Sequence, residues 1–361
     1  RDMSDMESFA LWCKPRDDSE LSSIRVLMNF NLWLESEKSS QMQPSLDVGI
    51  MLLPGKKSAQ QEAKDSAQQN IGNIVDSIFF YCPFSVEQKD FNDLFEKMNQ
   101  ETIGAIFNDM CECTEASEHT AKRINLSKGD PCENFLLCKC NYEIQDGKTI
   151  KIKIDKEDIN QALNAFNKGI GNELMPIYYR FRLTGKPISN VITESHSKDQ
   201  LLTSAFSKEE IVDFRFNDYR TLGDETVKRN INNKDKKCVP IENTSIHFLL
   251  MSSANVDVDS GNGAERKRRL LEKTIWEKYA PIKQFDEVVA WHWKSELKEE
   301  SSNGYTMYLR LKRHVSNWKT IIIYLLVGLC INVFYNWVYD LPKGVVAAGL
   351  TLVVHNILHL S

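Results

Sequence analysis

The stretch IRVLMNFNLWLE, residues 24–35, alternates between two kinds of side chain along its length. Every second residue is apolar: Ile24, Val26, Met28, Phe30, Leu32 and Leu34. Polar side chains fall in the other set, namely Arg25, Asn29, Asn31 and Glu35. Because successive side chains of a β-strand point to opposite faces, this pattern predicts a long strand with one face in the core. We expect the fold to be built around the sheet that contains it.

Further strands are predicted on both sides of this stretch. Residues 46–55 are a suitable partner, and residues 77–84 form a shorter, more buried strand. Residues 134–154 predict a hairpin, with Asp146 and Gly147 at a type I′ turn. The remaining predicted strands lie near 177–184, 210–220, 245–258, 286–297 and 305–312, the last two joined as a hairpin.

Helices are predicted between these strands. Ser85 and Asp155 are typical N-caps, and we expect helices over 85–98 and from Asp155 to about residue 167. A third helix is expected over residues 264–279. The predicted fold class is therefore α+β, mainly antiparallel β with flanking helices.

Composition and the positions of glycine and proline suggest how the 361 residues are divided into domains. With 42% hydrophobic and 26% charged residues the chain has the composition of a globular protein, and its net charge of −5 excludes a general attraction to nucleic acid or membrane surfaces. Glycine and proline cluster in residues 167–176, which marks a boundary. We expect an N-terminal cytoplasmic α+β domain over 1–170, a β-rich cytoplasmic ligand region over 171–315, and a tail over 316–361.

The tail is strongly apolar. Residues 320–338 are long enough to span ~30 Å of hydrocarbon as a helix, and a second run covers 344–360 after a break at Asp340–Lys343. Basic residues before the first run outnumber the single Lys343 in the turn, which places the N-terminal part in the cytoplasm. The pattern predicts a two-helix transmembrane hairpin; the alternative is a buried helical hairpin of a soluble protein.

Several polar side chains lie within these apolar runs. Asn332 and Asn336 are four residues apart and share one helix face, and Thr351 and His355 do the same in the second run. Polar side chains inside a membrane usually face a bundle interior or a water-filled cavity. These four residues are our candidates to line a pore, which requires a homo-oligomer; the alternative is a passive anchor.

No motif predicts metal binding or catalysis. The spacing of Cys111, Cys113, Cys138 and Cys140 does not match the common zinc knuckles, and small buried hydrophobic residues account for them better. Nucleophile-elbow, P-loop, zinc-peptidase and kinase motifs are missing from the sequence. We therefore expect no enzyme, no metal and no cofactor.

Cationic residues gather in the second half of the chain. On the strand at 177–184, Tyr178, Arg180 and Arg182 share one face, and arginines beside an aromatic ring suit phosphate contacts and base stacking. The predicted binding residues for a nucleotide or short DNA are Tyr178, Arg180, Arg182, Arg215, Arg266, Lys267, Arg268 and Arg269. The alternative is a solvated charged face.

The order of these parts resembles the membrane effectors of bacterial anti-phage systems, and in plan it is similar to the channel effector of the Hailong system. The resemblance lies in the large N-terminal part followed by the short apolar tail WKTIIIYLLVGLCINVFYNW to GVVAAGLTLVVHNIL. It implies a multi-pass protein of the bacterial inner membrane that acts as a homo-oligomer, with a tetramer as the candidate state. It also implies an antiviral channel regulated by the short DNA product of a partner nucleotidyltransferase. A membrane-tethered protein-binding scaffold is the alternative function.

Overall fold

The computed structural model describes residues 7–16, 23–34, 44–55, 71–117, 120–166, 175–185, 188, 190–195, 207–233, 235–261, 267–280, 287–298, 304–314 and 318–339. The chain divides into two compact units. The first combines residues 1–194 with 210–311, and the second combines 195–209 with 312–361.

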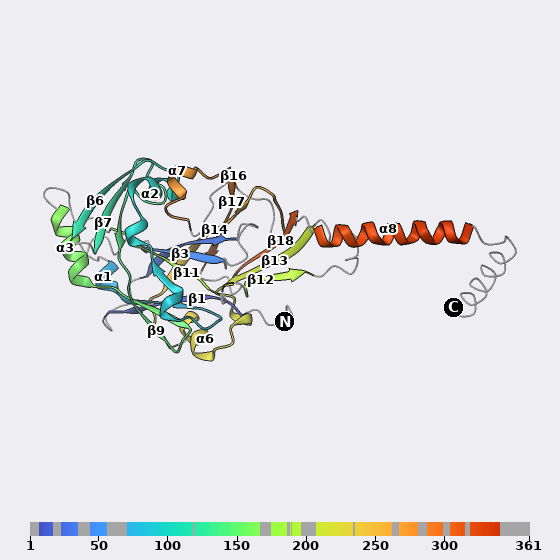
Figure 1. Ribbon diagram of the computed structural model, residues 1–361. Coiled ribbons are helices and arrows are strands. Elements are labelled where there is room, and N and C mark those ends of the chain that lie inside the picture. The colour runs from blue at the N-terminus through green and yellow to red at the C-terminus, as the bar shows by residue number, and fades with distance from the viewer. Residues whose placement is uncertain are drawn as a thin grey trace. The chain divides into compact units, whose positions relative to one another are not determined.

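A mixed ten-stranded sheet forms the centre of the first unit (Figure 1). Its strands run in the order β16 (Lys267–Leu270), β17 (Val288–Lys298), β14 (Ile241–Ser253), β2 (Ile24–Trp33), β3 (Ser45–Pro54), β11 (Ile177–Leu183), β8 (Asn134–Cys138), β7 (Ala121–Leu126) and β6 (Cys111–Ser117), with β5 (Phe91–Asp93) paired to β11. The strand predicted from residues 24–35 is thus confirmed as β2, in the interior of the sheet. Its neighbours are antiparallel β3 and parallel β14.

One face of this sheet carries the main core. The apolar side chains of β2, such as Val26, Met28 and Phe30, are 0–1% exposed and belong to the largest hydrophobic cluster. The four-stranded sheet of β1 (Ala10–Pro15), β4 (Val75–Tyr81), β10 (Thr149–Lys153) and β9 (Asn141–Gln145) contributes to the same cluster. So does a second sheet, β12 (Ile192–Ser195), β13 (Ser207–Phe216), β18 (Tyr305–His314) and β15 (Val256–Ser260). Phe30 meets Phe80 and Phe214 at ring-centroid distances of 6.4 and 4.7 Å.

The opposite face of the ten-stranded sheet is only partly covered. The helices α2 (Gln100–Phe107) and α7 (Lys273–Trp276) lie on that side, away from β1, β9 and α6 (Glu225–Ile231) (Figure 1). A second hydrophobic cluster holds them to the sheet through residues such as Trp33, Met51, Ile103 and Trp276. The uncovered part of this face is polar, and it positions the candidate site.

Two predicted helices are wrong. Residues 85–98 form two 3₁₀ turns around β5, because Phe91 is buried in the core and its strand pairs with β11. Of the predicted helix over 264–279, the described part from Lys267 onward forms the edge strand β16 and the single-turn α7, because residues from Lys267 to Leu270 pair with β17. Local helical spacing gives way in both places to pairing with a strand distant in sequence.

The turn signal at Asp146 and Gly147 and the cap signal at Asp155 are confirmed, whereas Ser85 caps no helix. Asp146 and Gly147 have φ angles of 51° and 61°, as a type I′ turn requires, and they join β9 to β10. Asp155 precedes α3 (Lys156–Phe166), and its Oδ1 accepts a 2.9 Å bond from the Glu157 amide. The predicted hairpin of 134–154 is therefore limited to β9 and β10, since β8 belongs to the ten-stranded sheet.

Strands from both predicted cytoplasmic regions share this sheet. β11 pairs with β3 and β14 pairs with β2, so segments on either side of residue 170 alternate across it. In the part of the chain that the structure describes, the two regions therefore contribute to one common core.

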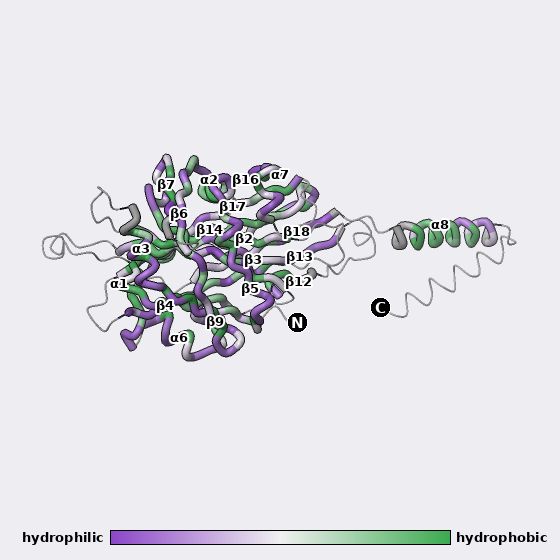
Figure 2. Tube along the Cα trace, turned by 60° about the vertical axis from the view of Figure 1, so that its left-hand side comes forward, coloured by the Kyte–Doolittle hydropathy of each residue, from purple (hydrophilic) through white to green (hydrophobic). Residues whose placement is uncertain are grey.

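In the second unit, α8 spans Trp318–Tyr339, and most of it is hydrophobic (Figure 2). Its side chains are described for residues 322–337 and for Tyr339. Over the residues described, no helix has the length and apolar character needed to cross a membrane. The predicted two-span hairpin and the inner-membrane location are contradicted by this finding. The second predicted span, residues 344–360, lies outside the described residues.

Candidate functional site

Strand register brings the polar side chains of four strands onto one face. Asn29 of β2 lies opposite His247 of β14, which lies opposite Lys294 of β17. His292 of β17 in turn lies opposite Lys267 of the edge strand β16. Residues directly opposite in a sheet share a face. The polar set of the 24–35 pattern therefore continues across three further strands.

This polar face is the floor of a cleft of about 540 Å³. One wall is formed by the end of α2 and the loop that follows it, residues 105–109. Further wall residues come from the loop after β7, including Lys128 and Asp130, and from Trp276 of α7. All of these residues belong to the first unit.

Buried polar atoms on the floor lack hydrogen-bond partners. They are Asn31 Oδ1, Asn243 Oδ1 and Ser245 Oγ. The Asn31 side chain is only 3% exposed, so its amide lies at the bottom of the cleft. A buried acceptor without a donor costs roughly 1–3 kcal/mol. The floor is thus suited to a ligand that donates hydrogen bonds, as sugar hydroxyls and base amino groups do.

Cationic side chains outnumber acidic ones around the cleft. Those that line it are Arg25, Lys128, Lys267, Arg269 and Lys294, against Asp109, Asp130 and Glu296. Arg25 and Arg269 are positioned by bonds to the Pro54 and Ala105 carbonyls, at 3.1 and 2.7 Å. Lys294 lies 3.6 Å from Glu296. This balance favours anions.

Two histidines lie side by side on the floor. Nε2 of His292 is 3.1 Å from Nδ1 of His247, and the rings stack with centroids 5.0 Å apart at 27°. One of the two nitrogens must carry the proton that the other accepts. The pair is therefore hydrogen-bonded when both rings are neutral.

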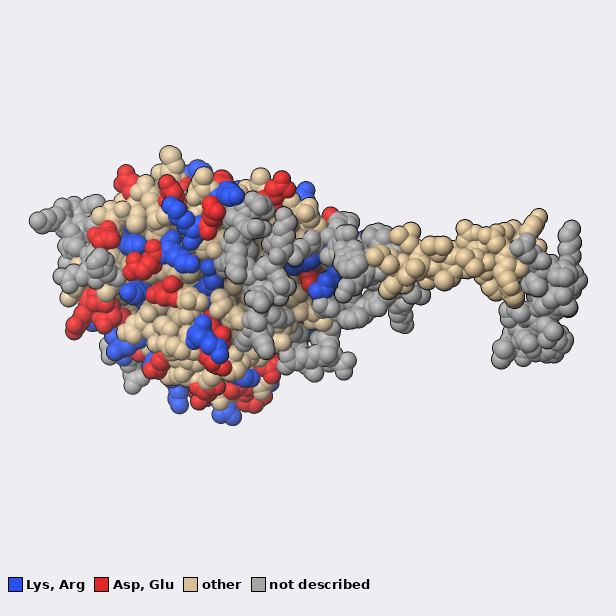
Figure 3. Space-filling model, viewed as in Figure 1, with Lys and Arg blue, Asp and Glu red and all other residues tan. Residues whose placement is uncertain are grey.

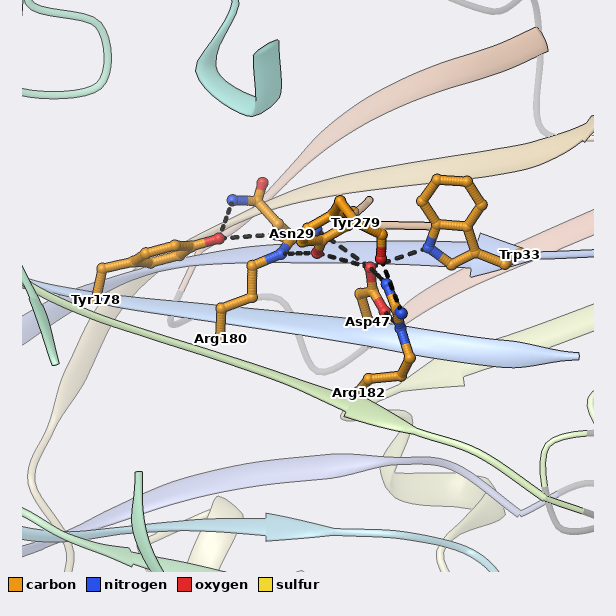
Figure 4. A network of polar contacts seen from close by, with 7 residues as sticks. All are labelled: Asn29, Trp33, Asp47, Tyr178, Arg180, Arg182 and Tyr279. Atoms are coloured by element: carbon orange, nitrogen blue, oxygen red, sulfur yellow. Dashed lines mark hydrogen bonds and ion pairs between the residues drawn. The ribbon is translucent and has the colours of Figure 1, made fainter. Parts of the chain in front are cut away.

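Beside the cleft floor, on the same face of the sheet, Asp47 is the centre of a buried polar network (Figure 4). Its carboxylate accepts bonds from Arg182 Nε at 2.5 Å and Arg182 Nη2 at 3.0 Å. It also accepts from Trp33 Nε1 at 2.9 Å and from Tyr279 Oη at 2.8 Å. Burial would raise the pKa of Asp47, but Arg182 and Arg180 outweigh this, so its pKa lies below the ordinary value.

Arg180 extends this network towards the cleft. It is 0% exposed and donates from Nε to Tyr279 Oη at 2.6 Å and from Nη1 to Tyr178 Oη at 2.8 Å. Its Nη2 makes no hydrogen bond and is 3.7 Å from Asp47. Arg180 and Arg182 thus share one carboxylate, which leaves excess positive charge beside the floor. Asn29, which lines the cleft, is 3.5 Å from Tyr178 Oη.

Gly49 of β3 makes room for this network. A methyl group at its Cα would overlap Tyr178 Oη and approach Arg180 Nη1 to 3.0 Å. We expect Gly49→Ala to lower the free energy of unfolding by about 1–3 kcal/mol, as overpacking does in a close-packed interior. Urea unfolding measures the loss. Adding Tyr178→Phe removes the overlapping oxygen, so the double variant should regain part of the lost free energy of unfolding. If the losses of the two single variants simply add, this explanation is contradicted.

The structure separates the predicted binding residues. Tyr178, Arg180 and Arg182 do share a face, but they are 0–3% exposed inside the network and present no surface to a ligand. Arg215 pairs with Asp213, with Nη2 at 2.7 Å from Oδ2. The sequence correctly predicted that these three side chains share one face of β11. That Tyr279 covers this face could not be inferred from the sequence of the strand alone.

The cluster at 266–269 is only partly brought to the cleft. Lys267 and Arg269 line it, while Arg268 has the opposite parity on β16 and Arg266 lies outside the described residues. Sequence reasoning missed most of the lining residues, among them Arg25, Asn243, Ser245, His247, His292 and Lys294. The alternation of polar residues along 241–247 and 292–296 was the available signal.

Of the four predicted pore residues, the structure describes Asn332 and Asn336, which lie in α8. Asn336 Nδ2 donates to Asn332 Oδ1 at 3.2 Å, so these two residues do share one helix face. Thr351 and His355 lie outside the described residues. Their predicted role in a pore stays a prediction.

Metal ligands are not grouped in the part of the chain that the structure covers. Among the described residues, no three His, Cys, Asp or Glu side chains are placed to hold an ion. Cys138 and Cys140 are buried, and burial raises the pKa of Cys138 to about 12. Both therefore stay protonated thiols, as expected for small core residues.

Comparisons give no family. No protein-family model and no curated protein matches the chain. Solved structures that match include an M1 zinc metallopeptidase from Deinococcus radiodurans, with a TM-score of 0.27 and 7% identity over 82% of this chain and 44% of that one. A mutant of it bound to a Tyr-Ser-Ala substrate gives a TM-score of 0.28 and 7% identity over 81% and 43%.

The chain thus spans less than half the length of these enzymes. The similar solved structures named here are enzymes, and the prediction that this chain is not an enzyme is therefore withdrawn. A TM-score of 0.28 nevertheless carries no argument for peptidase activity here.

Proposed function

We propose that the first unit is a sensor domain that binds a phosphate-bearing ligand, a nucleotide or a short oligonucleotide, in the polar cleft. The observation that carries the proposal is the pairing of two features in one cleft. Unpartnered buried acceptors, including Asn31 Oδ1, form the floor, and cations such as Lys267 and Arg269 lie around it. Phosphates suit the cations, and sugar or base donors suit the floor.

Two further features support this ligand class. Phe107 lines the cleft and is held from behind by Phe135 and Tyr178, at centroid distances of 5.1 and 5.5 Å, so it offers a fixed ring for a base. Acidic and basic side chains are interspersed over the face shown in Figure 3. The resemblance to the Hailong channel effector favours the same ligand class, since the ligand there is the short DNA product of a partner nucleotidyltransferase.

A charge-reversal experiment tests the proposal. We expect a fluorescent oligothymidylate to bind the full chain, and Lys267→Glu with Arg269→Glu to weaken binding by roughly 100-fold. Affinity should also fall steeply with salt, because bound phosphates release counterions. Fluorescence anisotropy measures both.

The matched control is Lys153→Glu with Lys237→Glu. Both lysines are exposed and neither lines the cleft, yet the change in net charge is identical. Because Arg269 also bonds to Ala105 O, the melting temperature of each variant is measured. Equal weakening by the control, or no binding at low salt, would rule out the cleft as the site. The predicted homo-oligomer is measured in the same samples by light scattering.

A further inference from the structure

We propose that the His247–His292 pair makes ligand binding proton-linked, so that affinity for phosphate-bearing ligands rises as the pH falls from 8 to about 5.5. The inference rests on the proposed function, since it concerns the same cleft. The two histidines lie on the floor of a cleft that is lined mainly by cationic side chains, and a merely structural role would not require that position.

The geometry allows the pair to take up one proton but not two. When both rings are neutral, one N–H···N bond joins Nε2 of His292 and Nδ1 of His247 across 3.1 Å. A proton added to the outer nitrogen of the donor ring keeps that bond and makes it charge-assisted. A second proton would place two N–H groups against each other and break it. The pair therefore has a neutral state and a stable singly charged state.

The surrounding charges decide which state is present. Those that line the cleft with the pair are Lys294 and Glu296 on β17, Lys267 and Arg269 on β16, Arg25 on β2, and Asp109, Lys128 and Asp130 on the loops. Cations predominate, so in the free protein they oppose protonation of the pair. A bound polyanion neutralises them and adds negative charge beside the rings, which favours the charged state.

Linkage converts this preference into pH-dependent affinity. If binding is accompanied by uptake of one proton, lowering the pH by one unit tightens binding by up to tenfold. Histidine is the side chain whose ordinary titration falls between pH 5 and 8. Since the ordinary titration of histidine covers only part of this interval, we expect a gain on the order of tenfold between pH 8 and 5.5.

The probe must not titrate itself. A short oligothymidylate with hydroxyl ends carries only phosphodiesters, whose charge is constant in this range, whereas a terminal phosphate titrates near pH 6. Affinity for this probe is measured at both pH values and constant ionic strength. Calorimetry in two buffers of different ionisation enthalpy counts the protons taken up.

The expected results distinguish proton linkage from ligand binding itself. The wild-type chain should bind on the order of tenfold more tightly at pH 5.5 and take up close to one proton. His247→Asn with His292→Asn keeps hydrogen-bonding amides and should lose both effects.

Binding with equal affinity at both pH values and no proton uptake would overturn the proton linkage and leave the proposed function standing. The same holds if the double variant keeps its pH dependence. Absence of binding at either pH would remove both. The proton count on the wild-type chain decides the question even if the double variant does not fold.

Discussion

Replacing Asp47 by alanine is expected to lower the free energy of unfolding by about 3–5 kcal/mol, the usual cost of removing one partner from a buried ion pair. The reason is that Arg182 and Arg180 would remain in the interior, 3% and 0% exposed, without their carboxylate. Tyr279 Oη and Trp33 Nε1 would lose their acceptor as well. Denaturant unfolding followed by tryptophan fluorescence measures the loss.

Asp213→Ala is the matched control. It also removes a carboxylate from an arginine on a strand, but the side chains of Arg215 and Asp213 remain 20% and 14% exposed. Water can replace the lost partner there, so the expected cost is about 0–1 kcal/mol. Equal losses for the two variants would show that burial of the network is not what makes Asp47 important.

The pH dependence of stability gives an independent check on Asp47. Because its folded-state pKa is depressed, the stabilisation is present above the unfolded-state value of about 3.9. It is lost as the pH falls through the still lower folded-state pKa. The difference in unfolding free energy between wild type and Asp47→Ala should therefore be constant near neutral pH and narrow below about pH 4. A difference that widens in acid would contradict this sign.

Trp276→Ala is expected to cost about 3–5 kcal/mol and also to weaken ligand binding. The indole is 1% exposed, packs against Trp33 and Tyr279 at 6.0 and 5.5 Å, and lines the cleft. The α7 helix has only four residues, so without this anchor little holds that wall in place. Unfolding and oligothymidylate affinity are measured on the same preparation.

Trp12→Ala separates the two effects. Trp12 is 5% exposed and stacks on Phe79 at 5.4 Å in a different cluster, away from the lining residues. We expect a similar loss of stability with unchanged affinity under conditions where the variant is folded. If both variants weaken binding equally, the effect of Trp276 is one of global stability rather than of the cleft wall.

Patterns with a period of two residues were the most informative part of the sequence. The alternation in 24–35 predicts β2, and the sharing of a face by Tyr178, Arg180 and Arg182 is also correct. Alternation assigns residues to a face, but it does not say what covers that face. Arg180 is covered by Tyr279, 99 residues further along the chain, so its burial is a property of the tertiary structure.

The cleft could be predicted only in part for the same reason. Lys267 and Arg269 were identified by their charge, yet the segment that carries them was expected to be helical. Pairing with β17 overrides that local preference and places every second side chain at the cleft. The histidine pair could not be anticipated, because His247 and His292 come together only through the register of β14 and β17.

The parallel pairing of β2 with β14 has a consequence for synthesis on the ribosome. Ile24 and its neighbours have no partner on that edge until the segment beginning at Ile241 has emerged. At about 5–20 residues per second, the apolar β2 waits on the order of ten seconds or longer beside an open edge. Such an edge invites pairing with other nascent chains. We therefore expect fragments that end before β14 to aggregate, and the full chain to depend on chaperones while it is being made.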